Sequence, residues 1–205
     1  MLNDSVFLLG IGLGLRHATD ADHVVAVSTL LHREPGLFRA MRLALYWGIG
    51  HSTTFLGTGL LVVLTGWHVP ATYERFVELL VGVTLVILGL TGLLVHTHVH
   101  RSPSLARPVS IGLLHGLAGS AGVALLALTT IRSAAHAVLY LVVFAGGTLV
   151  GMAILTAVIA WLLGRVDSGH RSARALTQLP CAFSVGIGVL FAAEAVGGLL
   201  QGGAR

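Results

Sequence analysis

Apolar residues form long runs along the chain, separated by short polar breaks. The runs are roughly twenty residues long, the length of α-helix that crosses the hydrocarbon core of a bilayer. The pattern predicts helices over 5–31, 43–66, 76–95, 109–131, 137–163 and 178–200. We therefore expect an all-α polytopic membrane protein with six transmembrane helices, forming a single integral membrane domain over 1–205.

The first run is expected to be a mature span rather than a signal peptide. The segment MLNDSVFLLGIGLGL has no basic n-region, carries Asp4 and continues directly into a charged cluster. A secretory signal has a positively charged start and a small-residue cleavage site instead.

The composition agrees with a membrane location. Hydrophobic residues make up 55% of the chain, charged residues make up 10%, and the mean hydropathy is +0.90. All 12 basic residues are arginine, and the isoelectric point is near 10.2. In a soluble protein this basicity would suggest nucleic acid, but in a membrane protein it reflects topology. The expected partner is the lipid bilayer, with no nucleic acid.

The arginines also predict the orientation of the chain. One side of the predicted membrane carries Arg33, Arg39, Arg42, Arg101, Arg107, Arg165, Arg171 and Arg174. The other side carries Arg75, Arg132 and Arg205. Because arginine-rich loops stay in the cytoplasm, we expect a multi-pass protein of the cell membrane, plasma or inner, with both termini on the outer side.

Soft metal ligands are scarce in this chain. Cys181 is the single cysteine, and the methionines are Met1, Met41 and Met152. Disulfides, thiolate sites and thioether sites for Cu(I) are therefore poorly supplied. A metal ion bound here must be held by nitrogen and oxygen atoms.

Two pairs of segments are similar within the chain. GLRHATDAD at 14–22 aligns with GLLHGLAGS at 112–120, and LYWGIGHSTTFLG at 45–57 aligns with LYLVVFAGGTLVG at 139–151. The alternative is that helices rich in Gly and Leu align by chance.

The alignment places His17 opposite His115 and divides the domain into halves of about 1–96 and 109–205. Three helices per half is an odd number, so the two copies would be inverted relative to each other. Many secondary transporters have this 3+3 inverted plan, with the substrate site near the midplane on interrupted helices.

RHATDADHVVAV at 16–27 gathers five ionisable side chains in an apolar run, namely Arg16, His17, Asp20, Asp22 and His23. On an ideal helix each residue rotates by about 100°, so His17, Asp20 and His23 share one face while Asp22 points away. Asp22 then contacts a neighbouring helix, pairs with Arg16 over a distorted turn, or joins the site where the helix unwinds.

Two ionised carboxylates deep in a bilayer cost several kcal/mol unless they are paired. Arg16 can neutralise one of them. A divalent metal ion bound with the imidazoles of His17 and His23 would compensate the other, so we expect Asp20 and Asp22 to join these histidines in a metal site. The alternative is a self-satisfied polar cluster that only locks helix packing.

His51 in GIGHSTTF is expected at the same depth as His17, in the middle of the membrane. It is the fifth candidate ligand, although a lone intramembrane histidine is often a hydrogen-bonded packing residue. Ser52 and Thr53 follow it with hydroxyls that bond their own backbone or solvate an ion. Together with Arg16, His115 and Ser120 they are candidates for the transport pathway or for supporting the ligands.

RHATDADH at 16–23, followed by GHSTT at 50–54, resembles the nickel/cobalt transporter family. The signature of that family is a His, four residues and Asp-His on one transmembrane helix, then Gly-His-Ser-Thr on the next. The short chain and LLHGLAGS at 113–120 are similar to its urease-accessory nickel permease branch. The resemblance is firm over 10–57 and extends to about 130; the later Asp-Thr element of longer members is missing.

The resemblance implies uptake of Ni²⁺ or Co²⁺ as cargo through a His/Asp site at the membrane midplane, with no prosthetic group and no enzyme activity. Raw affinity of such ligands would favour Cu²⁺, so selectivity must come from geometry. Because a ligating imidazole must be neutral, binding should weaken as the pH falls through roughly 6.5. The chain has no nucleotide-binding signature, and homo-oligomers and nickel-enzyme maturation proteins stay open as partners.

HTHVH at 96–100 places His96, His98 and His100 at the predicted cytoplasmic end of the third helix. These histidines are candidates for a relay that receives departing metal. The alternative is a solvated histidine loop beside Arg101.

Two other functions compete with metal uptake. An intramembrane hydrolase could use Ser120 with His115 or His51 as base, or a zinc ion held by His17, His23 and an aspartate. The zinc signature His-Glu-x-x-His is absent, however, and small-residue runs usually pack helices. A metal exporter of the same fold would use the same site, because nothing in the residues fixes the direction.

Overall fold

The computed structural model describes residues 2–31, 36–66, 69–94, 106–118, 131, 133–165 and 171–202. Every regular element in these ranges is an α-helix: α1 Leu2–His17, α2 Ala21–Leu31, α3 Leu37–Thr65, α4 Ala71–Leu94, α5 Ala106–Leu117, α7 Ala134–Gly164 and α8 Arg171–Gly202. The expectation of an all-α fold is confirmed for the described part of the chain.

Four of these helices are long and apolar enough to cross a membrane: Leu37–Thr65, Ala71–Leu94, Ala134–Gly164 and Gln178–Gln201. They correspond to four of the expected spans. The helix expected over 109–131 begins as α5, and most of its second half lies outside the described residues.

The single helix expected over 5–31 was wrong, because the chain leaves the helix after His17 and forms a new one at Ala21. Between them the amides of Thr19 and Asp20 donate to carbonyls only three residues back, at 2.9 and 3.0 Å. The Thr19 hydroxyl also donates to the Arg16 carbonyl at 2.6 Å. Polar side chains that compete for the backbone in this way favour helix ends over helix interiors.

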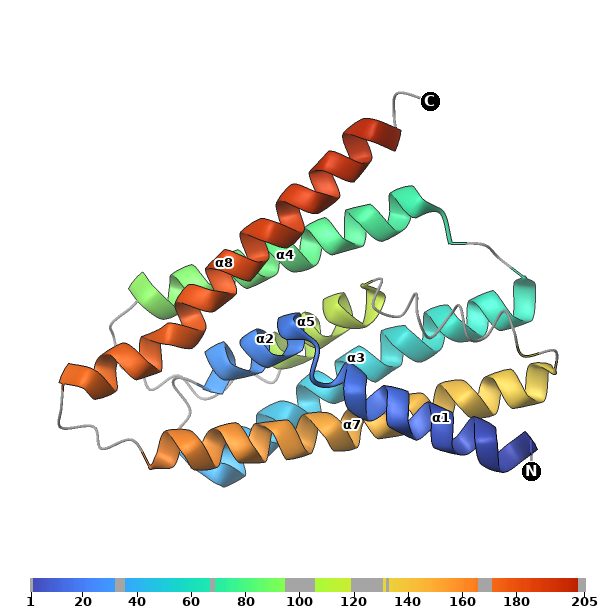
Figure 1. The fold of residues 1–205 in the computed structure, drawn as a ribbon, viewed down its shortest axis with the longest axis horizontal. Helices are drawn as coiled ribbons and strands as arrows, with labels where there is room; N and C mark the ends of the chain where they lie inside the picture. The colour runs from blue at the N-terminus through green and yellow to red at the C-terminus, as the bar shows by residue number, and fades with distance from the viewer. Residues whose placement is uncertain are drawn as a thin grey trace.

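The helices pack as neighbouring pairs, α4 with α8, α1 with α7 and α3 with α5, while α3 also packs on α7. Figure 1 shows the short helices α2 and α5 in the middle of the molecule, between the α4–α8 pair and the layer of α1, α3 and α7. The polar break between α1 and α2 is partly at the surface: Thr19 and Ala21 are exposed, whereas His17, Asp22 and His23 beside it are buried.

Glycines allow the backbones of α3 and α5 to approach closely. A methyl group on Gly112 would overlap the carbonyl of Trp47, and one on Gly116 would overlap the carbonyl of His51. The Thr54 hydroxyl donates to the Leu113 carbonyl at 2.9 Å across the same contact. Small residues at this spacing are typical of helix pairs in membranes.

Large apolar side chains cover much of the outer surface of the bundle. Among the most exposed are Phe38, Leu64, Leu94 and Leu200, each more than 70% exposed. Soluble monomers rarely show so much apolar surface, and bilayer lipid is the solvent that suits it.

Candidate metal site

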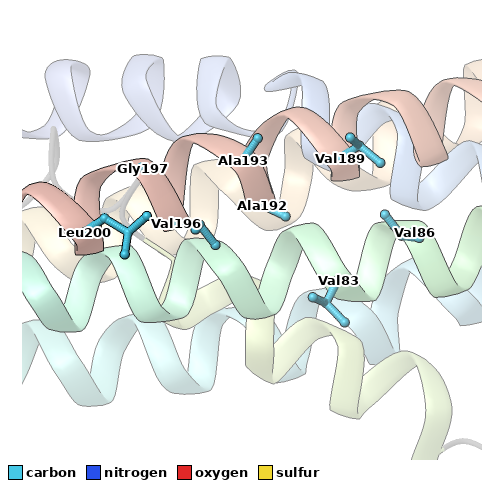
Figure 2. Close-up of a pocket in the computed structure, with 8 residues that line it drawn as sticks. All are labelled: Val83, Val86, Val189, Ala192, Ala193, Val196, Gly197 and Leu200. Atoms are coloured by element: carbon cyan, nitrogen blue, oxygen red, sulfur yellow. The ribbon is translucent and has the colours of Figure 1, made fainter.

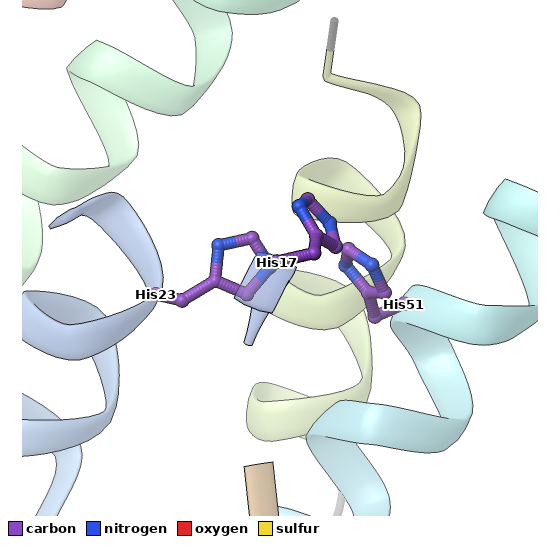
Figure 3. A group of neighbouring side chains, drawn as sticks. All are labelled: His17, His23 and His51. Carbon is purple, nitrogen blue, oxygen red and sulfur yellow. The ribbon is translucent and has the colours of Figure 1, made fainter. Parts of the chain in front are cut away.

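Three histidines from separate helices meet in the middle of the bundle. His17 ends α1, His23 lies in the first turn of α2, and His51 lies midway along α3. Each offers one ring nitrogen, and these nitrogens all lie within 4.8 Å of one another. Figure 3 shows the three rings converging on one point.

The distances between the rings are short on every side of this triangle. The ring centroid of His17 lies 4.6 Å from that of His23 and 5.3 Å from that of His51, and His23 and His51 are 5.0 Å apart. An ion bound about 2.0–2.1 Å from each nitrogen needs nitrogens about 3–3.5 Å apart, so rings whose nitrogens lie within 4.8 Å would have to turn toward one another to hold it.

The three rings are almost completely buried, at 5%, 0% and 2% exposure for His17, His23 and His51. Both ring nitrogens of His23 and of His51 lack a hydrogen-bond partner in the described part of the chain. Each unsatisfied buried polar atom costs roughly 1–3 kcal/mol. A cation bound between the rings would offset this cost, so the burial fits a ligand site better than a packing cluster.

His17 is oriented by a carboxylate. Its Nδ1–H donates to Oδ2 of Asp20 at 2.8 Å, which leaves the lone pair on Nε2. A histidine that binds metal commonly has this arrangement, because the outer hydrogen bond fixes the tautomer and the ring orientation.

The two aspartates have different environments, contrary to the expectation from a continuous helix. The Asp20 side chain is 39% exposed, whereas that of Asp22 is 6% exposed, with Oδ1 3.1 Å from Nδ1 of His23. Despite this short distance, no hydrogen bond joins Asp22 to His23. Asp22 joins the cluster because the helix ends before it, which was one of the alternatives for this residue.

Arg16 and Thr53 lie away from the cluster. Arg16 is exposed, and within the described residues no ion pair joins it to Asp20 or Asp22. Thr53 is exposed and donates to the Ile49 carbonyl at 2.7 Å. Ser52, by contrast, is buried next to His51, and its Oγ has no partner in the described part of the chain.

His115 lies against His23, with ring centroids 5.9 Å apart. It comes from α5, which is the yellow-green helix beside the three rings in Figure 3. Ser120 and the histidines at 96, 98 and 100 fall outside the described residues, so their roles stay predictions.

Trp47 belongs to the cluster, although it was not among the predicted site residues. Its ring is fully buried and lies 5.2 Å from His23, 5.7 Å from His115 and 6.2 Å from His51. The available signal was its position four residues before His51, which places both side chains on one face of α3.

A pocket away from the cluster, between α4 and α8, offers no metal ligands. Figure 2 shows that it is lined by aliphatic side chains and one glycine, which are Val83, Val86, Val189, Ala192, Ala193, Val196, Gly197 and Leu200. The chemistry of the bundle is therefore concentrated at the histidines.

The sequence is similar to that of a named relative. The urease accessory protein UreH of Bacillus sp. (strain TB-90) is 34% identical over 173 residues, which cover 76% of this chain and 76% of UreH. This chain belongs to the urease-accessory branch of the nickel/cobalt transporter family. No family model and no solved structure matches the chain.

Membership of the nickel/cobalt transporter family confirms the resemblance carried by RHATDADH and GHSTT. In this member of the family, the histidines of the two motifs are the three that meet in the bundle. The structure therefore joins two elements that lie about thirty residues apart in the chain.

Proposed function

We propose that this protein imports Ni²⁺, or Co²⁺, across the cell membrane, and that the ion binds between His17, His23 and His51 on its way. The observation that carries this proposal is the convergence of three buried ring nitrogens within 4.8 Å at a break between two helices. Membership of the nickel/cobalt transporter family and the name of UreH agree with nickel as the cargo.

The ligand types suit a borderline divalent ion. Imidazole binds nickel, cobalt, copper and zinc, and the carboxylates of Asp20 and Asp22 supply negative charge next to the rings. In a low-dielectric bundle, Asp22 beside His23 would stabilise a cation strongly. We assign the ligand role to the three histidines and Asp22, and the orienting role to Asp20.

Reciprocal helix contacts support the inverted repeat. A methyl group on Gly14 of α1 would overlap the Phe144 carbonyl of α7, and one on Gly112 of α5 would overlap the Trp47 carbonyl of α3. The same methyl group would also meet the backbone nitrogen four residues after that carbonyl. This nitrogen belongs to Thr148 for Gly14 and to His51 for Gly112.

Two more pairs of glycines make matching contacts in the two halves. A methyl group on Gly147 would meet the carbonyl of Ile11, and one on Gly50 would meet the carbonyl of Val109. Gly82 and Gly188 would each meet the carbonyl of the other. In these contacts Trp47 and His51 of α3 correspond to Phe144 and Thr148 of α7. This match is shifted by three residues from the alignment of 45–57 with 139–151, while His17 and His115 stay equivalent.

Six spans with both termini outside follow from this plan. In Figure 1, α1 begins and α8 ends toward the same end of the molecule, and α1 and α5 run in opposite directions. Arg39, Arg42, Arg107 and Arg165 lie near the helix ends at the opposite end. The positive-inside rule makes that end cytoplasmic.

The test is accumulation of radioactive nickel and cobalt in cells that express the wild type, His23→Ala or His136→Ala. We expect the wild type to raise accumulation and His23→Ala to abolish the increase, because His23 contacts every other histidine of the cluster. His136→Ala, which removes a histidine outside the cluster, should accumulate metal like the wild type. Lowered accumulation with the wild type would indicate export, and no change with either metal would remove the transport proposal.

A further inference from the structure

His115 is fully buried on α5, and its two ring nitrogens have different surroundings. Nδ1 lies 3.0 Å from the carbonyl oxygen of Ile111. A carbonyl only accepts, so Nδ1 carries the hydrogen and the lone pair of the neutral ring is on Nε2. Nε2 is buried and has no hydrogen-bond partner in the described part of the chain.

A buried lone pair without a donor is costly unless a cation or a proton binds to it. The ring has little freedom to turn elsewhere, because it is fully buried and bonded to Ile111, and Gly112 and Gly116 hold α5 against the backbone of α3. Nε2 is therefore presented rigidly, as a ligand atom should be.

His115 does not belong to the triangle formed by His17, His23 and His51. Among the described side chains its ring contacts are with His23, at 5.9 Å, and Trp47, at 5.7 Å. His23 itself contacts His17, His51 and His115, so it is the histidine that all three others touch.

His17 and His115 are also prepared in the same way. Each lies near the end of a short helix that packs through glycine on a long helix, α1 on α7 and α5 on α3. Each has an Nδ1–H that donates to an acceptor close by in the chain, Asp20 for His17 and Ile111 for His115. In both residues Nε2 is left as the ligand atom.

We propose that His115 is the ligand of a second ion position, formed by His23 and His115 beside the carboxylate of Asp22. The ion passes from the position between His17, His23 and His51 to this one, and His23 is shared by both. This inference rests on the proposed function, and it assigns to His115 a step after binding rather than binding itself.

The test compares His115→Asn with His17→Ala and the wild type, each purified and placed in nickel-free vesicles or nanodiscs. Asparagine keeps an amide donor near the position of Nδ1, so the bond to Ile111 survives while the Nε2 ligand is removed. Two quantities are measured for each protein: Ni²⁺ binding at equilibrium by calorimetry, and Ni²⁺ uptake into vesicles.

We expect His17→Ala to weaken Ni²⁺ binding about 10-fold to 100-fold, the usual cost of losing a ligand or its support. His115→Asn should bind Ni²⁺ within about threefold of the wild type and take it up at least about tenfold more slowly, since only the step through the second position is lost. This split between binding and uptake is the result that a packing role for His115 would not produce.

Normal uptake by His115→Asn would overturn the inference and leave His115 as a structural residue bonded to Ile111. Loss of Ni²⁺ binding as large as that of His17→Ala would also overturn it, because His115 would then belong to a single four-histidine site. If the wild type neither binds nor takes up Ni²⁺, the proposed function itself fails, and the wild-type measurement alone identifies that case.

Discussion

At the scale of single residues, the pair Asp20 and Asp22 shows how two identical side chains acquire different tasks. Asp20 caps α2, because its carbonyl accepts from Val24 at 3.0 Å, and its partly exposed carboxylate holds Nδ1 of His17. Asp22 is buried against His23. In the proposed site the partly exposed carboxylate would orient a ligand, and the buried one would supply charge where the cation binds.

Neutralising the two aspartates should therefore have unequal effects. We expect Asp22→Asn to weaken Ni²⁺ binding about 10-fold to 100-fold, because it removes a charge from a site where the surrounding dielectric is low. Asp20→Asn, with the same change in charge, should cost only a few-fold, since its amide oxygen still accepts from His17 and water screens the carboxylate it replaces. Calorimetric titration of both purified variants measures this. Equal losses would contradict the different roles given to the two aspartates.

At the scale of helices, the contact between α3 and α5 sets the position of two of the histidines. Gly112 and Gly116 allow α5 to approach the backbone of Trp47 and His51, and the Thr54 hydroxyl bridges the same two helices. Because interiors are close-packed, an added methyl group here cannot be absorbed without moving one helix. The histidines are thus placed by residues that carry no metal-binding chemistry.

We expect Gly112→Ala to destabilise the protein by about 1–3 kcal/mol, the usual cost of overpacking. For a chain of this size each kcal/mol corresponds to about 2–4 °C in melting temperature. Gly57→Ala is the matched control: Gly57 lies in the same helix as His51, with open space where its methyl group would be, so its melting temperature should stay level or rise slightly. Thermal unfolding in detergent measures both. A Gly112→Ala variant as stable as Gly57→Ala would show that the α3–α5 contact is not tight.

At the scale of the whole molecule, helices that begin at opposite ends of the bundle bring polar groups to the same depth. The histidines beside the α1–α2 break, His51 of α3 and His115 of α5 are buried among the helices, although Thr19 and Ala21 of the break itself are exposed. A bilayer tolerates irregular backbone and ionisable groups only where protein or a cavity surrounds them. An ion bound by these histidines, as we propose, would exchange along a route lined by protein, which is what alternating access requires.

The proposed topology can be tested by labelling of cysteines in intact cells. Thr72, at the start of α4, is exposed and lies at the end of the bundle assigned to the outside, whereas Ala106, at the start of α5, is exposed at the cytoplasmic end. We expect a membrane-impermeant maleimide to label Thr72→Cys and to label Ala106→Cys only after the cells are opened. The native Cys181 is buried and should give little background. The reverse labelling pattern would show that the topology is inverted. The proposed import would then have to be tested against export.

The sequence by itself determined the helical class and most of the helix positions, and it predicts the residues proposed to bind the metal. Apolar runs of bilayer length have few alternatives to helices, because every backbone polar group must be satisfied within the segment. Ionisable residues in such runs are costly, so RHATDADH and GHSTT indicate function without any structure. The four long helices and the chain's family agree with those predictions.

The tertiary structure decided which of these residues meet. Helical periodicity placed Asp20 with the histidines and Asp22 away from them, but the break after His17 exposes Asp20 in part and buries Asp22. Thr19 competes for backbone hydrogen bonds, and the glycines allow close helix contacts. Each of these effects contributes a small energy, and a repeating pattern of apolar residues does not reveal their combined effect. The same packing brings His51 and Trp47 from α3 and His115 from α5 to His23. Contacts between residues distant in the chain depend on how the helices pack, and packing is decided only when all of them are assembled.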